Sequence, residues 1–269
     1  MVILGFALQP NVAFICGCTL PVYVRSNMTQ SDFKASAEDR SRFYWWLAEW
    51  FMKPPGSDEI ASLAGMALPA VDAQADALGA ALRTLRDVAQ TLSGKNSLDS
   101  LGAEYTRLMS GIQEGYGPPP PFESVWRENR LIGESTAAVI NIYAQAGFAD
   151  IDPEAGPQDH IGVELKFLAL LALRESEAWV AGSEDIAQTR AAQQEAFLNQ
   201  HLAAWAPRWA DAIIQQSHEP LFTTLAALLK ASLEQTHEEL ATSLKLGKKA
   251  SDLNLKREDI AHAGADGNI

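Results

Sequence analysis

Apolar residues recur at helical spacing along most of this chain. Between residues 32 and 53, Phe43, Leu47 and Trp50 follow one another at intervals of three or four, which is the spacing of one face of an amphipathic helix. We expect that helix to end before Pro54-Pro55-Gly56. No segment shows the sustained alternation that is typical of a half-buried strand. The pattern therefore predicts an all-α protein.

The same periodicity predicts a helical bundle over the rest of the chain. The further helices are expected at 57–66, 69–92, 98–109, 124–147, 159–180, 184–204, 207–216 and 219–243, with a turn at 93–97. Residues 159–180 are apolar nearly all round, which indicates a buried helix. The tail 245–269 is polar with mixed charge, and we expect it to be poorly ordered.

Composition shifts suggest how the chain is divided. The segment 150–158, DIDPEAGPQ, holds two prolines, a glycine and three acids, so it is predicted to be a hinge between an N-terminal lobe (28–149) and a C-terminal lobe (159–244). Residues 1–27 form an apolar extension that prolines interrupt, and its first basic residue is Arg25. We expect this extension to lie upstream of a true start at Met28. A weak membrane tether is the alternative.

Charge and cysteine content narrow the function classes. The chain has 34 acidic and 21 basic residues, a net charge of −13, which repels nucleic acid and anionic lipid and attracts cationic partners. We therefore expect no nucleic-acid partner and no stable membrane insertion. Cys16 and Cys18 are the only two cysteines. The rest of the chain thus lacks a disulfide framework, as is typical of a cytoplasmic protein.

The sequence offers little enzyme chemistry. It has no glycine-rich phosphate loop, no GxSxG elbow and no HExxH motif. His160 and Glu164 are four residues apart and share a helix face, but two ligands are too few for a metal site. We therefore expect no catalytic residues and no metal. A helical hydrolase that uses Asp159, His160 and Glu164 is the less favoured alternative, since it would require a further nucleophile or ligand in the same pocket.

The least helical stretch is GYGPPPPFESVW, residues 115–126. Its four prolines fix φ and favour an extended polyproline II segment. Aromatic and apolar residues flank it on both sides, and two carboxylates lie beside it: Tyr105, Leu108, Met109, Phe122 and Trp126, with Glu114 and Glu123. A preformed apolar surface edged by acids suits an amphipathic, positively charged peptide. The alternative is a stiff linker in a helical adaptor or scaffold protein that recognises no signal peptide.

Three motifs in order carry a family resemblance. They are EYTRLM followed by PPPPFESVW, then PQDHIGVELKFLALL, then FLNQHLAAWAPRWADAI. Together they resemble the TorD/DmsD/NarJ family of cytoplasmic chaperones, which mature molybdenum-containing redox enzymes. The resemblance covers residues 33–235, nearly the whole body of the chain.

This resemblance implies a TorD-type helical bundle that is not an enzyme. Such a protein binds the twin-arginine signal peptide or N-terminus of the precursor of a molybdopterin-dependent oxidoreductase, assists cofactor insertion and proofreads export. We expect a monomer or homodimer, the latter because the 150–158 hinge could allow a domain swap. The family implies no cofactor of its own, with weak guanine-nucleotide binding or transient molybdopterin contact in some members. The implied peptide-binding residues are Tyr105, Leu108, Pro119, Pro120, Phe122, Glu123, Trp126, Pro157, Asp159, His160 and Glu164.

Overall fold

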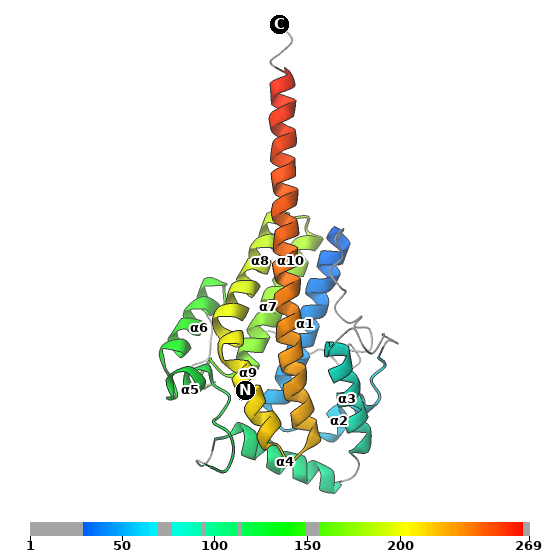
Figure 1. Cartoon of the computed structure of the whole chain (residues 1–269), viewed down its shortest axis with the longest axis vertical. Helices are drawn as coiled ribbons and strands as arrows, with labels where there is room; N and C mark the ends of the chain where they lie inside the picture. The colour runs from blue at the N-terminus through cyan, green and yellow to red at the C-terminus, as the bar shows by residue number, and fades with distance from the viewer. Residues whose placement is uncertain (1–28, 69–76, 93–94, 112–114, 149–155, 266–269) are drawn as a thin grey trace.

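The computed structural model describes residues 29–68, 77–92, 95–111, 115–148 and 156–265. Helices make up nearly all of these ranges (Figure 1), and no β-strand occurs within them, so the all-α prediction is confirmed. The elements are α1 (Gln30–Met52), α2 (Ser57–Ala64), α3 (Ala77–Thr91), α4 (Lys95–Met109), α5 (Glu123–Glu128), α6 (Glu134–Gln145), α7 (Ile161–Val180), α8 (Glu184–Phe197), the π-helical turn η3 (Leu198–Leu202), α9 (Ala203–Gln216) and α10 (Pro220–Ala265).

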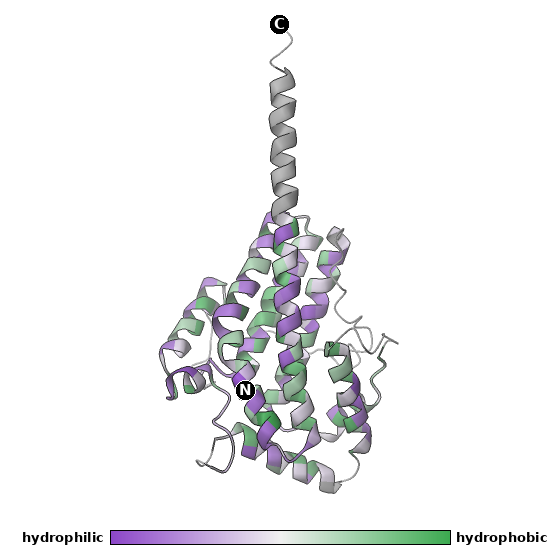
Figure 2. Cartoon of the chain, in the orientation of Figure 1, coloured by the Kyte–Doolittle hydropathy of each residue, from purple (hydrophilic) through white to green (hydrophobic). Residues whose placement is uncertain are grey.

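The long helices α1, α7, α8, α9 and α10 pack side by side to form the body of the molecule (Figure 1). α1 lies along α7, and α10 contacts α8, α9 and α3. Figure 2 shows apolar and polar residues interspersed along most helices, as expected for helices with one buried side. α7 is the exception predicted from its sequence, because every residue from Ile161 to Ala172 is buried.

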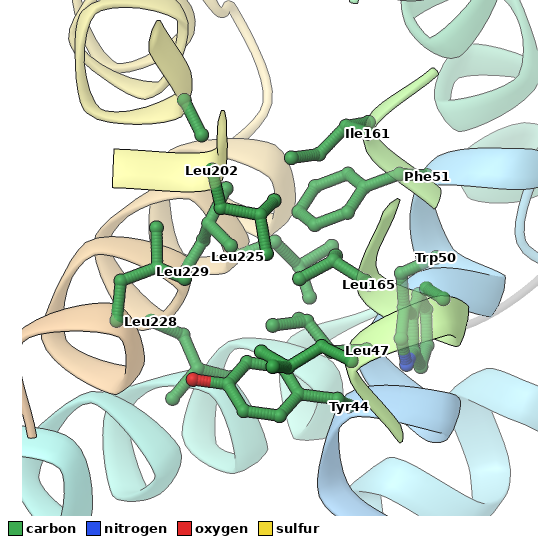
Figure 3. Close-up of a cluster of buried hydrophobic side chains, with 14 of the residues drawn as sticks. Tyr44, Leu47, Trp50, Phe51, Ile161, Leu165, Leu202, Leu225, Leu228 and Leu229 are labelled. Carbon is green, nitrogen blue, oxygen red and sulfur yellow. The ribbon is translucent and has the colours of Figure 1, made fainter. Parts of the chain in front are cut away.

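The core joins helices that are far apart in the sequence. Figure 3 shows leucine and aromatic side chains of α1, α7, η3 and α10 meeting in one cluster that includes Leu47, Leu165, Leu202 and Leu225. Tyr44 is the polar member of this region, and its hydroxyl donates to the carbonyl of Ser232 and lies 2.7 Å from the Thr236 hydroxyl. A buried hydroxyl with partners costs far less than an unpaired one, so Tyr44 links α1 to α10 at a reduced desolvation cost.

The predicted division into lobes at 150–158 stays a prediction, because residues 150–155 lie outside the described ranges. Helices on both sides of this segment contribute to the same hydrophobic cluster. The predicted apolar extension 1–27 also lies outside the described residues. None of the described helices combines the length and hydrophobicity that crossing a bilayer requires.

The helix predicted over 124–147 is broken into α5 and α6, so that prediction was wrong. Asn129 and Ile132 adopt left-handed backbone conformations, with φ of 55° and 59°. The carboxylate of Glu128 accepts from the amides of Glu134 and Ser135, both at 2.7 Å, and from the Ser135 hydroxyl at 2.6 Å. These bonds cap the start of α6, and they lower the pKa of Glu128 to about 2, with the Ser135 hydroxyl contributing most.

Further helix boundaries also differ from the prediction. α4 begins at Lys95, inside the turn that was expected at 93–97. α8, η3 and α9 run on without the expected break before Pro207, which lies inside α9. The π-helical turn directly precedes the turn that holds this proline, which cannot donate a backbone hydrogen bond. α10 continues to Ala265 rather than ending at 243, so its last part extends beyond the other helices (Figure 1).

Candidate functional site

The proline segment lies between α4 and α5 and packs against both. Pro118 and Pro121 are buried, whereas Pro119 is exposed and Pro120 is half-buried. The indole Nε1 of Trp126 donates to the Pro120 carbonyl at 3.1 Å. Gly111, just after α4, has φ of 55°, and a Cβ at this position would come within 2.6 Å of the Pro120 ring. The absence of a side chain at residue 111 therefore allows the proline segment to lie close to the end of α4.

A short antiparallel bridge between Phe122 and His160 joins the proline segment to the start of α7. The Glu123 amide donates to the Asp159 carbonyl at 2.8 Å, and the Ile161 amide donates to the Pro121 carbonyl at 2.9 Å. The two rings of the bridging residues lie 5.1 Å apart at a steep angle. Two sequence motifs that are separated by some forty positions thus meet at one place.

Behind this bridge lie three fully buried carboxyl groups. They belong to Glu123, Asp159 and Glu164, each with 0% of its surface exposed. The second oxygen of the Asp159 carboxylate accepts from the Ser124 amide at 2.8 Å. The indole Nε1 of Trp205 donates to Glu164 at 3.2 Å. Residues of α5, α7 and α9 therefore build one compact acidic cluster.

Two basic side chains face this cluster, and both contact Glu123. Nδ1 of His201 lies 2.8 Å from Glu123 Oε2. The guanidinium of Arg127 pairs with Glu123 Oε1 and also donates to the carbonyl of Gln200 at 3.0 Å. Gln200 and His201 belong to η3. Their contacts with Arg127 and Glu123 therefore hold this π-helical turn against α5 at the acidic cluster.

Burial and mutual repulsion set the protonation of the cluster. Burial is the main cause that raises the pKa of Glu164 well above its ordinary value of 4.5, and the nearby charge of Glu123 adds to it. Burial likewise raises the pKa of Tyr143, whose hydroxyl donates to the Gln158 carbonyl. Burial lowers the pKa of His160 to about 4. These shifts favour the protonated form of Glu164 and the neutral form of His160.

Several oxygens of the cluster are not satisfied by the described part of the chain. Ser124 Oγ, Asp159 Oδ1 and Glu164 Oε1 are buried and have no hydrogen-bond partner there. Buried polar atoms without partners are uncommon and often mark functional places. Among the residues that the structure describes, no three histidine, cysteine, aspartate or glutamate side chains are arranged to hold a metal ion.

The predicted site residues fall into two groups by exposure. Pro119 is exposed, and Tyr105, Pro120, Phe122, Trp126, Pro157 and His160 are half-buried. Leu108, Glu123, Asp159 and Glu164 are fully buried and present no surface to a ligand in this conformation. Tyr105 is set apart from the bridge, since its hydroxyl donates to the Phe51 carbonyl and its ring faces Phe222.

His160 does not form the carboxylate pair that the hydrolase alternative would use. Its Nδ1 accepts from the Gly162 amide at 3.1 Å, so the ring caps the start of α7. This is the role of an N-terminal helix residue rather than of a general base. Asp159 contacts α5 through the Ser124 amide instead.

Sequence reasoning did not select Ser124, Arg127, Tyr143, His201 or Trp205 as site residues. Glu123 and Arg127 are four residues apart, the spacing of an intrahelical ion pair, so Arg127 could have been found. His201 could not have been found in this way, because its position depends on the π-helical turn, and no sequence pattern predicted that turn.

Comparison with known proteins agrees with these motifs. The family described as nitrate reductase delta subunit matches residues 71–211. The chaperone protein TorD of Vibrio cholerae is 25% identical over 76% of this chain and 92% of its own length. TorD of Vibrio parahaemolyticus is 24% identical over 74% of this chain and 94% of its own.

A second type of relative matches a shorter part. The Tat proofreading chaperone DmsD of Salmonella typhi is 32% identical over 51% of this chain and 61% of its own length. The matched family segment covers more than half of the chain and contains the proline segment, the Phe122–His160 bridge and η3. The chain therefore belongs to the nitrate reductase delta subunit family, the family of TorD- and DmsD-type chaperones that its three motifs predicted.

Proposed function

We propose that this protein is a cytoplasmic chaperone for a molybdopterin-dependent oxidoreductase. It binds the twin-arginine signal peptide or N-terminus of the enzyme precursor, assists cofactor insertion and holds back export until insertion is complete. It acts by binding rather than by catalysis, as a monomer or homodimer. Weak guanine-nucleotide binding and transient contact with molybdopterin are part of the same proposal, because they come from the family resemblance.

The observation that carries the proposal is the bridge between Phe122 and His160. It brings the proline segment and the start of α7 together, and both lie within the residues that match the family. A twin-arginine leader has a basic segment followed by an apolar one. A protein that binds such a leader needs apolar contacts and carboxylates side by side.

The apolar contacts are assigned to Pro119, Phe122 and Trp126. Pro119 is exposed, and the two aromatic rings are half-buried, so each has surface left to bury against the apolar part of the leader. The proline backbone is already fixed before a ligand arrives, and the Trp126 indole is held by the Pro120 carbonyl. Binding therefore loses little conformational entropy on the protein side.

The carboxyl groups of Glu123 and Asp159 are assigned to the basic part of the leader, since burial favours the neutral form of Glu164. Arg127 and His201 both contact Glu123, whereas Asp159 accepts from the Ser124 amide. Glu123 is fully buried, so in this conformation it offers an incoming arginine no exposed surface. The net charge of −13 adds long-range attraction for the cationic segment.

A binding experiment tests the apolar half of this proposal. Calorimetric titration uses a synthetic peptide with two consecutive arginines followed by an apolar run. Phe122→Ala is expected to weaken its binding at least about tenfold, as truncation of an aromatic anchor usually does. The matched control is Ile140→Ala, which shortens an exposed apolar side chain of α6 and is expected to bind as the unmodified protein does.

A pull-down from the native cytosol tests the identity of the partner. The full chain is expected to capture the precursor of a molybdopterin oxidoreductase and to lose it when the leader of that precursor is deleted. Capture that does not depend on the leader would reject signal-peptide recognition. Equal peptide affinity of Phe122→Ala and the unmodified protein would favour the helical adaptor instead, in which the prolines serve only as a spacer.

A further inference from the structure

The carboxylate of Glu123 and the guanidinium of Arg127 differ strongly in exposure. Glu123 is fully buried, whereas 39% of the Arg127 side chain is exposed. Arg127 therefore approaches the acidic cluster from the solvent side, and its guanidinium covers one carboxylate oxygen of Glu123. The other oxygen of Glu123 is contacted from within the fold by His201.

The bonds of Arg127 at this position are those that any guanidinium could make. It pairs with Glu123 Oε1 and donates to the carbonyl of Gln200, so it uses one carboxylate oxygen and one backbone oxygen. Both acceptors are fixed by α5 and η3 and do not depend on the rest of the arginine side chain. A second guanidinium that arrives from solvent could form the same pair of bonds.

An exchange of one guanidinium for another leaves no acceptor unpaired at the end. This matters because a buried carboxylate that loses its cation without replacement is strongly destabilised. An ammonium group is a compact point charge and lacks the planar fork of donors. It would replace Arg127 less well, so the exchange itself would distinguish arginine from lysine.

We propose that Arg127 is an internal competitor for the arginine of the ligand: it occupies the Glu123–Gln200 acceptors in the free protein and is displaced when a leader arginine binds. This inference rests on the proposed function and adds a specificity-determining residue to it. The displaced Arg127 side chain moves into solvent, where it is already partly exposed. The site then selects arginine over lysine because a guanidinium replaces Arg127 better than an ammonium group does.

The test compares peptide affinities of three full-length proteins by calorimetry. The proteins are the unmodified chain, Arg127→Gln and Arg130→Gln. Arg130 is 57% exposed and pairs with Glu128, so its variant removes the same charge close by without touching Glu123. The probes are a synthetic leader peptide with two consecutive arginines and the same peptide with two lysines.

If Arg127 competes with the ligand, Arg127→Gln binds the arginine peptide about tenfold more tightly than the unmodified protein, since the bond to be broken is a charge-assisted one. Its gain for the lysine peptide is smaller. Arg130→Gln stays within about twofold for both peptides, because an exposed charge contributes little. Arg127→Lys serves as a second variant, with an intermediate gain for the arginine peptide.

Two results would overturn the inference while the proposed function stands. One is unchanged or weaker arginine-peptide binding by both Arg127 variants, with melting temperatures like that of the unmodified chain, which would make Arg127 a clamp between α5 and η3. The other is an equal gain from Arg127→Gln and Arg130→Gln, which would reduce the effect to net charge. Failure of the unmodified protein to bind either peptide would reject the proposed function and this inference together.

Discussion

At the scale of single residues, Glu164 combines full burial with two acidic neighbours. Its carboxyl lies near Glu123 of α5, Asp159 before α7 and Tyr143 of α6, and it accepts from Trp205 of α9. His201 of η3 contacts Glu123 in the same cluster. Burial raises its pKa well above 4.5. The folded protein therefore keeps this proton to a higher pH than the unfolded chain does. Stability from this group is complete below about pH 4.5 and declines as the pH rises towards the folded pKa.

Glu164→Gln tests this protonation state. A neutral glutamine imitates the protonated carboxyl and can still accept from Trp205, so we expect the variant to match the unmodified protein near pH 4. Between about pH 4.5 and pH 8 the unmodified protein should lose melting temperature relative to the variant, because its folded state must keep a proton that the unfolded chain releases. Thermal unfolding across this pH range measures the difference.

A control on the same helix separates burial from charge. Glu177→Gln removes a carboxylate that is 52% exposed and pairs with Arg174. Its stability should follow the unmodified protein in parallel across the same pH range. If Glu164→Gln also runs parallel, Glu164 is ionised in the folded protein, and the repulsion within the cluster must be relieved in another way.

At the scale of elements, a buried polar network fixes how four helices meet. Arg40 of α1 pairs with Glu175 of α7 at 2.6 Å and lies 3.7 Å from Glu239 of α10. Its Nε donates to Gln194 of α8 at 3.0 Å. All of these side chains are almost fully buried. Because the network pairs one specific arginine with acceptors on three other helices, it favours one register of α1 against α7.

Removing the cation of this network should be costly. We expect Arg40→Met to lower the free energy of unfolding by about 3–5 kcal/mol, since Glu175 and Glu239 would stay buried without it. Arg42→Met, on the same helix, removes a 29% exposed side chain that pairs with Glu38, and about 1 kcal/mol or less is expected there. Urea unfolding at neutral pH measures both. A loss below about 1 kcal/mol for Arg40→Met would mean that packing alone sets the register.

The break between α5 and α6 shows a limit of predicting helices from sequence patterns. The periodicity of residues 124–147 is compatible with one helix, and only Asn129 and Gly133 indicate an interruption. The break is made by Glu128, whose carboxylate turns back to the amides of Glu134 and Ser135. Such a cap forms only when the chain has already turned. Local propensity therefore could not distinguish one continuous helix from two helices separated by a break. The same holds for η3, where the π-helical turn positions His201.

At the scale of the whole molecule, the bundle could be predicted because burial of apolar faces leaves a strong periodic signal. α1 shows this signal, because Phe43, Leu47 and Trp50 recur every three or four positions, whereas the buried α7 was recognised by being apolar nearly all round. The site could be predicted only in part. The motifs named Phe122, Asp159 and His160, which the structure brings together, but no pattern shows that the carboxylates lie behind the aromatic rings rather than beside them.

The last expectation concerns the net charge of −13. Raising the salt concentration from about 0.1 M to about 1 M shortens the screening length from about 10 Å to about 3 Å. Long-range attraction of a cationic leader should then weaken, and the association rate constant of the arginine peptide should fall about tenfold or more. The dissociation rate constant should change little, because contacts at Phe122 and Trp126 and bonds at the acidic cluster act only at short range.

Stopped-flow tryptophan fluorescence can follow both rates, since Trp126, one of seven tryptophans, is half-buried in the candidate site. A peptide whose arginines are replaced by glutamines provides the control, since its association should be slow and nearly independent of salt. If both peptides show the same salt dependence, the charge of the protein does not steer the leader. If salt acts mainly on dissociation, the arginines contribute through short-range ion pairs, and the acidic surface serves solubility rather than recognition.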